Sequence, residues 1–249
     1  MEVNKLSSTA FLIVFFATLL VQNNAVANSN PITAAAATTN PLDAIKINNA
    51  IELPVKAIQA VNTDSAIFFI SKDGRYAFKG QMYDVWEKKS LKTMDDISYS
   101  ATHISLKKLG VNVDSLNTIT LNKSQSTGKD VVIFIDPQCS ICHQLIKNSQ
   151  ALASEYNFKF IVVPALGEKS NELSKKLFCA TDKTNAVSSL LNNAIASMPQ
   201  KQKCDLQQYN KTLLFAQMIN IDGVPFLIAP DGRINKGMPQ NLKTWIGGV

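Results

Sequence analysis

The feature that most constrains the fold of this chain is a cysteine pair that directly follows a strand-like run. Residues 131–135 read Val-Val-Ile-Phe-Ile, a continuous β-branched and aromatic run typical of a strand that is covered on both faces. Cys139 and Cys142 come next, and they open a segment with a helical pattern that continues to about Tyr156. A strand that leads through a short turn into a helix predicts a domain of mixed α and β structure.

The position of this CxxC pair predicts redox chemistry. Backbone N–H groups at a helix N-terminus are unpaired, and together with the helix dipole they favour a negative charge. A cysteine at that point has a lowered thiol pKa and therefore a larger thiolate fraction at neutral pH. We expect Cys139 to attack a substrate disulfide as the nucleophile, and Cys142, one turn inside the helix, to resolve the mixed disulfide.

Three other interpretations of the CxxC motif compete with redox catalysis. A structural zinc site needs two further ligands at matching spacing, and Cys179 and Cys204 do not form a second CxxC. A purely structural disulfide within CxxC would be strained. The segment 139–143 (CSICH) also matches the attachment motif of c-type haem. That motif needs no buried strand before it, and haem would leave the other two cysteines unexplained, so we expect no metal and no cofactor.

The first 27 residues have the pattern of a secretory signal peptide. Lys5 lies in a short polar start, residues 10–21 form an uncharged apolar run, and Ala25-Val26-Ala27 is a small-x-small cleavage site. The apolar run is shorter than the about 20 residues of a membrane span, and an uncleaved signal anchor is the alternative. Export to an oxidising compartment favours disulfides among the four cysteines. The formal net charge of +6 comes from scattered lysines, typical of a solvated surface, so we expect no nucleic-acid partner.

A strand-rich segment precedes the CxxC domain. Residues 28–40 are rich in Asn, Thr and Ala and have the composition of a flexible leader, and residues 42–53 predict a short helix. Asp73-Gly74 is a strong hairpin signal, because this dipeptide accepts the positive φ angles of such turns. A helix over residues 95–109 would connect this small sheet to the second domain. The predicted strands of the sheet are 55–61, 66–70 and 76–78.

The second domain shows an alternation of predicted strands and helices, which indicates a mixed sheet covered by helices. After the strand at residues 131–135, the predicted strands are 158–163 and 226–229. The predicted helices are 171–180, much of 184–216 and 239–246.

Two further signals lie downstream of the CxxC motif. Pro225 begins a predicted strand, a position where either isomer of its peptide bond is permitted. A cis Val224–Pro225 bond would expose the Val224 backbone for pairing with an extended substrate. The alternative is an ordinary trans proline. Cys179 and Cys204, 25 residues apart in a polar helical region, form either a structural disulfide worth about 2–4 kcal/mol or a second redox pair. Asp136 stands in an Asp-Pro turn before the motif, or accepts a proton during exchange.

Several short motifs occur in a recognisable order. They are the segment Met82-Tyr83-Asp84-Val85, the strand end with Asp136 followed by CSICH, and the FCA-x-D-K run from Phe178 to Lys183. With the Gly-Val-Pro segment ending at Pro225, this order resembles the bacterial periplasmic disulfide isomerases DsbC and DsbG of the thioredoxin superfamily. The resemblance covers nearly all of the chain after residue 27.

The resemblance implies an α+β and α/β architecture: a small N-terminal β-rich dimerisation domain, a linker helix, and a C-terminal thioredoxin-like domain with a helical insertion. It also implies that Cys139 is the nucleophile and Cys142 the resolving cysteine, that Pro225 is cis, and that Cys179 and Cys204 form a structural disulfide. The implied domains are the signal peptide at 1–27, the leader and dimerisation domain at 28–94, the linker helix and connection at 95–123, and the catalytic domain at 124–249.

The resulting hypothesis is thiol–disulfide exchange on misoxidised exported proteins in the periplasm, by a homodimeric isomerase or reductase. A membrane thiol reductase would keep the catalytic pair reduced, and Val224 and Pro225 would bind the substrate. Two positions differ from the usual isomerase pattern: Ser140-Ile141 replaces Gly-Tyr or Pro-Tyr between the cysteines, and Val224 replaces Thr before the proline. The alternatives are a disulfide oxidase and a chaperone-like binding module for exported or secretion-apparatus proteins.

Overall fold

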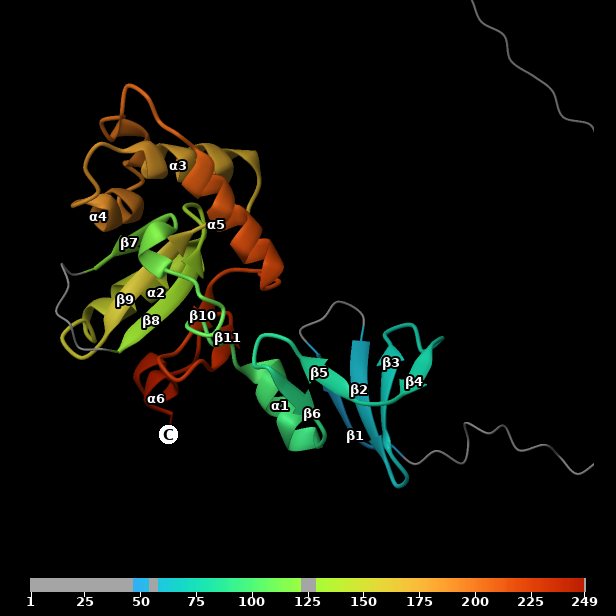
Figure 1. Cartoon of the computed structure of the whole chain (residues 1–249). Coiled ribbons are helices and arrows are strands. Elements are labelled where there is room, and N and C mark those ends of the chain that lie inside the picture. The colour runs from blue at the N-terminus through green and yellow to red at the C-terminus, as the bar shows by residue number, and fades with distance from the viewer. Residues whose placement is uncertain (1–46, 54–57, 122–128, 249) are drawn as a thin grey trace, which may run out of the picture. The chain divides into compact units, whose positions relative to one another are not determined.

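The computed structural model describes residues 47–53, 58–121 and 129–248 (Figure 1). The expected signal peptide at 1–27 and the leader at 28–40 lie outside these residues, as does the polar segment 124–128. The described chain contains a four-stranded sheet, a two-stranded sheet and a five-stranded sheet.

The N-terminal domain is built on the four-stranded antiparallel sheet, in which each strand pairs with the next one along the chain. Gly74 has a φ of +71° in the turn before the last strand, as the Asp-Gly signal predicts. Phe69 and Ala60 from the two middle strands are buried in a small core together with Ile97 from the following helix. The strands are β1 (Ile47–Glu52), β2 (Ile58–Thr63), β3 (Ile67–Ser71) and β4 (Ala77–Lys79).

The prediction of a helix over residues 42–53 is wrong for its described part. Residues 47–52 form β1, which pairs with β2 in antiparallel register from Ile47 opposite Thr63 to Glu52 opposite Gln59. The first four residues of β1 are exposed, so this edge strand carries no alternating apolar pattern by which the sequence could have revealed it. Hydrogen bonds with the neighbouring strand β2 determine its conformation.

A two-stranded sheet and one helix complete the N-terminal part: β5 (Met82–Asp84), β6 (Lys89–Leu91) and α1 (Met94–Thr102). Thr93 begins α1 with a capping box, in which its side chain accepts from the Asp96 N–H and the Asp96 side chain accepts from the Thr93 N–H. The helix ends at Thr102, earlier than the predicted residue 109. At that point the backbone becomes extended, and the Ile104 N–H donates to the Gly232 carbonyl at 2.8 Å instead of continuing the helix.

The second domain is built on the five-stranded sheet, with strand order β11-β10-β8-β9-β7. Its two central strands, β8 and β9, run parallel and are connected by α2, while the other neighbouring pairs are antiparallel. No strand was predicted at the position of β7. The strands are β7 (Thr118–Thr120), β8 (Asp130–Ile135), β9 (Asn157–Val162), β10 (Phe226–Ile228) and β11 (Ile234–Lys236).

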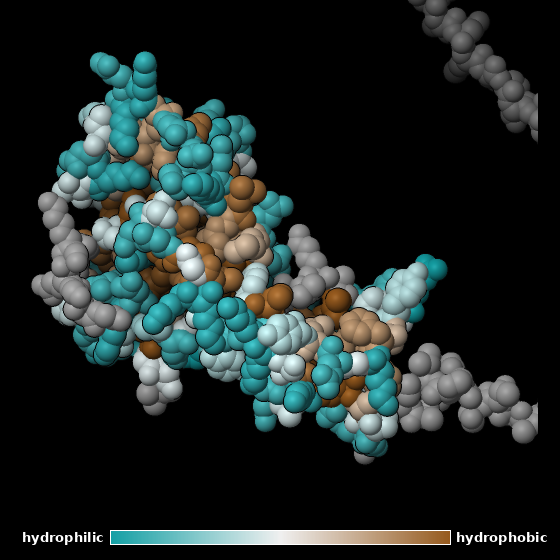
Figure 2. Space-filling view, in the orientation of Figure 1, coloured by the Kyte–Doolittle hydropathy of each residue, from teal (hydrophilic) through white to brown (hydrophobic). Residues whose placement is uncertain are grey.

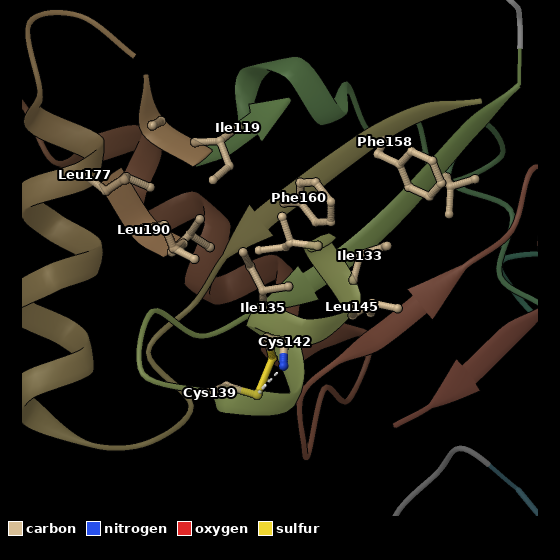
Figure 3. Close-up of a cluster of buried hydrophobic side chains, with 14 of the residues drawn as sticks. Ile119, Ile133, Ile135, Cys139, Cys142, Leu145, Phe158, Phe160, Leu177 and Leu190 are labelled. Carbon is tan, nitrogen blue, oxygen red and sulfur yellow. Dashed lines mark hydrogen bonds between the residues drawn. A yellow bond between two sulfur atoms is a disulfide. The ribbon is translucent and has the colours of Figure 1, made fainter. Parts of the chain in front are cut away.

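Helices cover both faces of this sheet, and β8 is therefore buried on both sides. Val131, Ile133 and Ile135 face a core shared with α2, α3, α4 and α6, part of which is drawn in Figure 3. Val132 and Phe134 face a second core shared with α5. The helices are α2 (Ser140–Gln150), α3 (Glu168–Cys179), α4 (Ala186–Leu191), α5 (Gln207–Met218) and α6 (Leu242–Gly247), with 3-10 turns η1 (Val113–Ser115) and η2 (Ile195–Ser197).

This arrangement confirms the predicted fold class, an N-terminal β-rich domain followed by a thioredoxin-like α/β domain with a helical insertion. The insertion consists of the helices between β9 and β10, of which α4 lies next to β7 (Figure 1). The visible surface is mainly hydrophilic, and hydrophobic residues reach it in patches (Figure 2). None of the helices in the described residues is long and apolar enough to cross a membrane.

Candidate active site

The cysteine pair lies where β8 passes into α2, as the sequence predicts. Cys139 is the N-cap residue of α2, and its Sγ accepts a hydrogen bond from the Cys142 N–H at 3.1 Å (Figure 3). The two cysteines form a disulfide with their Cα atoms 5.1 Å apart. The sulfur of Cys139 therefore takes the capping place that a Ser or Asp side chain commonly occupies, directly at the positive end of the helix.

The two sulfurs differ in how they are surrounded. Cys142 is fully buried in the core beside Leu145 and Ile146, whereas Cys139 keeps 7% of its surface exposed. Both apolar neighbours lie on the face of α2 that packs against the sheet. A partner from outside can therefore reach Cys139 and not Cys142.

The Gly-Val-Pro segment lies against Cys139. The carbonyl oxygen of Val224 lies 3.9 Å from Cys139 Sγ, although 85 residues separate the two in the chain. The Val224–Pro225 peptide bond is cis, and Pro225 directly precedes β10. The structure thus brings together the catalytic and substrate-binding residues named from the sequence.

Asp136 forms the base of the active-site loop. It is fully buried, and its carboxylate accepts three hydrogen bonds: from the Gln138 N–H at 2.7 Å, the Ser170 Oγ–H at 2.8 Å and the Leu166 N–H at 2.9 Å. Its own carbonyl accepts from the Cys139 N–H at 3.1 Å. Both carboxylate oxygens accept hydrogen bonds from the surrounding loops, which is the arrangement of a turn-forming residue.

The partners of Asp136 are the functional neighbours that sequence reasoning missed. Leu166 and Ser170 lie 30 and 34 residues beyond Asp136, in the loop after β9 and the first turn of α3. No local motif marks them. A signal exists only in the fold, since β8 and β9 are parallel and the loops that follow them lie at the same edge of the sheet.

His143 is held by the backbone of the active-site loop. Its Nε2 lies 2.8 Å from the Pro137 carbonyl oxygen. The observed contact stabilises the turn before Cys139.

The second cysteine pair is also a disulfide, between Cys179 at the end of α3 and Cys204 in the segment before α5. Its surroundings are held by backbone pairing, since the Lys201 N–H donates to the Cys179 carbonyl at 2.9 Å and Ala180 forms a β-bridge with Gln200. These bonds place the pair inside the helical insertion.

Behind the site, α3 and α5 are joined by a buried phenol. The Tyr209 hydroxyl donates to Asn171 Oδ1 at 2.7 Å. Burial, and to a smaller extent the negative charges of Glu168 and Asp136, raise the pKa of Tyr209 to about 12. The residue is therefore neutral at any physiological pH and acts as a packing and hydrogen-bonding group.

Comparison with known proteins points to one group of relatives. The family described as "Disulfide bond isomerase protein N-terminal domain" matches residues 23–93. The thiol:disulfide interchange protein DsbC of Salmonella typhimurium is 23% identical over 199 residues, which cover 78% of this chain and 78% of that protein. The protein of the same name from Pasteurella multocida is 26% identical over 191 residues, 74% of this chain and 76% of that protein.

Among solved structures, the disulfide interchange protein from Neisseria gonorrhoeae matches with 18% identity and a TM-score of 0.41, over 55% of this chain and 97% of that one.

Proposed function

Because this chain belongs to the DsbC family of thiol:disulfide interchange proteins, we propose that it catalyses thiol–disulfide exchange on exported proteins through Cys139 and Cys142. The observation that carries the proposal is the unequal burial of the two sulfurs at the start of α2. Cys139 caps the helix and keeps 7% of its surface exposed, and Cys142 is fully buried behind it. This is the arrangement that a nucleophile and a resolving cysteine require.

The reaction begins with the reduced pair. The thiolate of Cys139 attacks one sulfur of a client disulfide; a bond forms between Cys139 Sγ and that sulfur, the client S–S bond breaks, and the second client sulfur leaves as a thiolate. The N–H of Cys142, 3.1 Å from Cys139 Sγ, stabilises the negative sulfur before attack.

The mixed disulfide then has two fates. In isomerisation, a different client thiolate attacks the client sulfur bound to Cys139, which forms a new client disulfide and releases Cys139 as a thiolate. In reduction, Cys142 loses its proton and attacks Cys139 Sγ, which forms the Cys139–Cys142 disulfide and releases the client as a dithiol. Only the second path consumes the reduced pair, and we propose that a membrane thiol reductase restores it.

Val224 and Pro225 position the client chain in this scheme. The Val224 carbonyl, 3.9 Å from Cys139 Sγ, is close enough for the backbone of an extended client to pair with it while the client cysteine meets the nucleophile. The Cys179–Cys204 disulfide has a structural role in the insertion.

The remaining assignments concern the whole chain. We propose that residues 1–27 direct export to the periplasm and that the domain at 28–94 forms a homodimer, followed by the linker at 95–123 and the catalytic domain at 124–249. The match of residues 23–93 to the isomerase N-terminal domain supports the dimerisation role. Light scattering on the protein without residues 1–27 tests it, and a monomer at micromolar concentration contradicts it.

Refolding of a model protein with scrambled disulfides tests the proposed chemistry. We expect the reduced protein to restore native disulfides, Cys139→Ser to abolish this activity, and Cys142→Ser to accumulate a mixed disulfide with the client. The Cys142→Ser variant is the matched control, since it removes one thiol and leaves the attacking one.

The alternatives give different results in the same assay. Rapid oxidation of a reduced client without recovery of native disulfides would assign the oxidase direction. Suppression of client aggregation that survives Cys139→Ser, with no detectable thiol exchange, would assign a binding module and refute the proposal.

A further inference from the structure

Well-exposed large hydrophobic side chains are few in the described part of the second domain, residues 103–121 and 129–248. They are Ile141, Leu166, Leu214 and Met218. Ile141 is 51% exposed and lies between the two cysteines, and Leu166 is 57% exposed in the loop after β9. A single exposed leucine is common on protein surfaces, so any significance of Leu166 comes from its attachment to the active-site loop.

Leu166 is held next to the active-site loop by Asp136. The Leu166 N–H donates to Asp136 Oδ2 at 2.9 Å, and the Asp136 carbonyl accepts from the Cys139 N–H at 3.1 Å. One buried residue thus contacts the backbones of both the nucleophile and the exposed leucine. The Ser170 hydroxyl, on the same carboxylate, attaches the start of α3 to this point as well. The leucine is therefore presented from a fixed backbone.

Two of the segments that border Cys139 carry no charge beside it, whereas the third, residues 223–225, follows Asp222, which is paired with Lys236. Ala165, Leu166 and Gly167 are exposed on one side, and Ser140 and Ile141 on the other. The first charged residue along the loop is Glu168. An uncharged, partly apolar border is suited to an apolar side chain and offers nothing to a charged one.

We infer that Leu166, together with Ile141, binds an apolar side chain that neighbours the client cysteine under attack, and so selects clients by the residue next to that cysteine. The inference rests on the proposed thiol–disulfide exchange. Such a site would favour client cysteines that have an apolar residue beside them over cysteines flanked by polar residues. The leucine contacts the client chain and takes no part in the transfer between sulfurs.

Two peptides that differ in one residue test the inference. Each carries one cysteine bound to thionitrobenzoate through a disulfide, with Leu or Ser beside that cysteine. The reduced Cys142→Ser protein attacks the peptide sulfur, the Cys139–peptide disulfide forms, and thionitrobenzoate leaves as a coloured thiolate. Because Cys142 is absent, the reaction stops there, and the second-order rate constant reports client selection alone.

We expect the Leu peptide to react about 5- to 10-fold faster than the Ser peptide. This ratio is at the low end of the discrimination that one apolar contact provides, because Leu166 stays partly exposed. Leu166→Ser in the same background should remove this preference and leave the Ser-peptide rate unchanged. Leu214→Ser is the matched control: it is the same substitution at a residue 65% exposed on α5, which covers the opposite face of the sheet from α2. It should keep the full preference.

Two results would overturn the inference while leaving the exchange chemistry intact. One is a fast reaction with equal rates for both peptides, and the other is a preference that persists in Leu166→Ser. If neither peptide reacts, the proposed function itself fails, and this inference fails with it.

Discussion

Removal of the Cys179–Cys204 disulfide separates its two possible roles, structural support and redox activity. The bond closes a loop with a sequence separation of 25 residues that contains α4 and η2. Backbone bonds from Lys201 to Cys179 and the bridge of Ala180 with Gln200 remain when the sulfurs are removed. We therefore expect the double variant Cys179→Ala/Cys204→Ala to fold with lower stability.

The size of the loss follows from the loop. In the chain-entropy description, freeing a loop of 25 residues raises the entropy of the unfolded chain by about 12 cal/mol/K, or about 3.5 kcal/mol at 25 °C. With a urea dependence of about 2 kcal/mol per molar, the unfolding midpoint should fall by about 1.7 M. The catalytic pair lies outside the loop, so exchange activity under native conditions should be retained.

Urea titration followed by circular dichroism measures the midpoint, and the peptide exchange reaction measures activity. Cys139→Ala/Cys142→Ala is the matched control, because it also removes one disulfide but one whose sequence separation is only 3 residues. It should abolish exchange with a smaller loss of stability. A Cys179→Ala/Cys204→Ala variant that keeps its midpoint and loses exchange would refute the structural role and favour a second redox pair.

Three further predictions follow from the buried and paired groups. Asp136→Asn turns an NH₂ group toward one of three donors, so we expect the free energy of unfolding in urea to fall by about 1–3 kcal/mol and thiol–disulfide exchange to slow. An unchanged stability and exchange rate would show that the carboxylate does not organise the loop. Because the pKa of Tyr209 is raised to about 12 from 10.0, its contribution to stability is fully present below pH 10 and lost as pH rises toward 12, and Tyr209→Phe should lose less stability over that interval. The ammonium of Lys89 holds the pKa of Asp96 well below its usual range, so this carboxylate supports α1 above about pH 4 and loses that effect as pH falls further; Asp96→Asn should flatten the acid dependence of helix content.

The start of the active site could be predicted because all its determinants are contiguous. Residues 131–135 consist of apolar residues that are buried on both faces, and Cys139 follows them at the distance of one tight turn. Local sequence contains both the strand composition and the helix start. The same reasoning predicted the hairpin at Gly74, since its positive φ depends on the residue itself.

Elements that depend on distant partners were harder to predict. The strand β1 was expected to be helical, because its exposed edge shows no period of two and its conformation depends on pairing with β2. The helix α1 is shorter than predicted because the Ile104 N–H finds a partner at Gly232, 128 residues later. In both cases backbone hydrogen bonds to another segment, the adjacent strand for β1 and Gly232 for the end of α1, outweighed the local preference.

The same division between local and distant determinants explains how selectivity could be built into this site. The chemistry of Cys139 depends on its place at the start of α2, which the chain secures locally. The exposed Leu166 shares a hydrogen-bonding partner with that cysteine, Asp136, because β8 and β9 end at one edge of the sheet and Asp136 joins their loops. Substitutions in the loop after β9 can therefore change which clients are preferred without changing the sulfur chemistry. Asp136 is the residue that couples the two, so its replacement should disturb both client preference and exchange rate, whereas replacement of Leu166 should disturb preference alone.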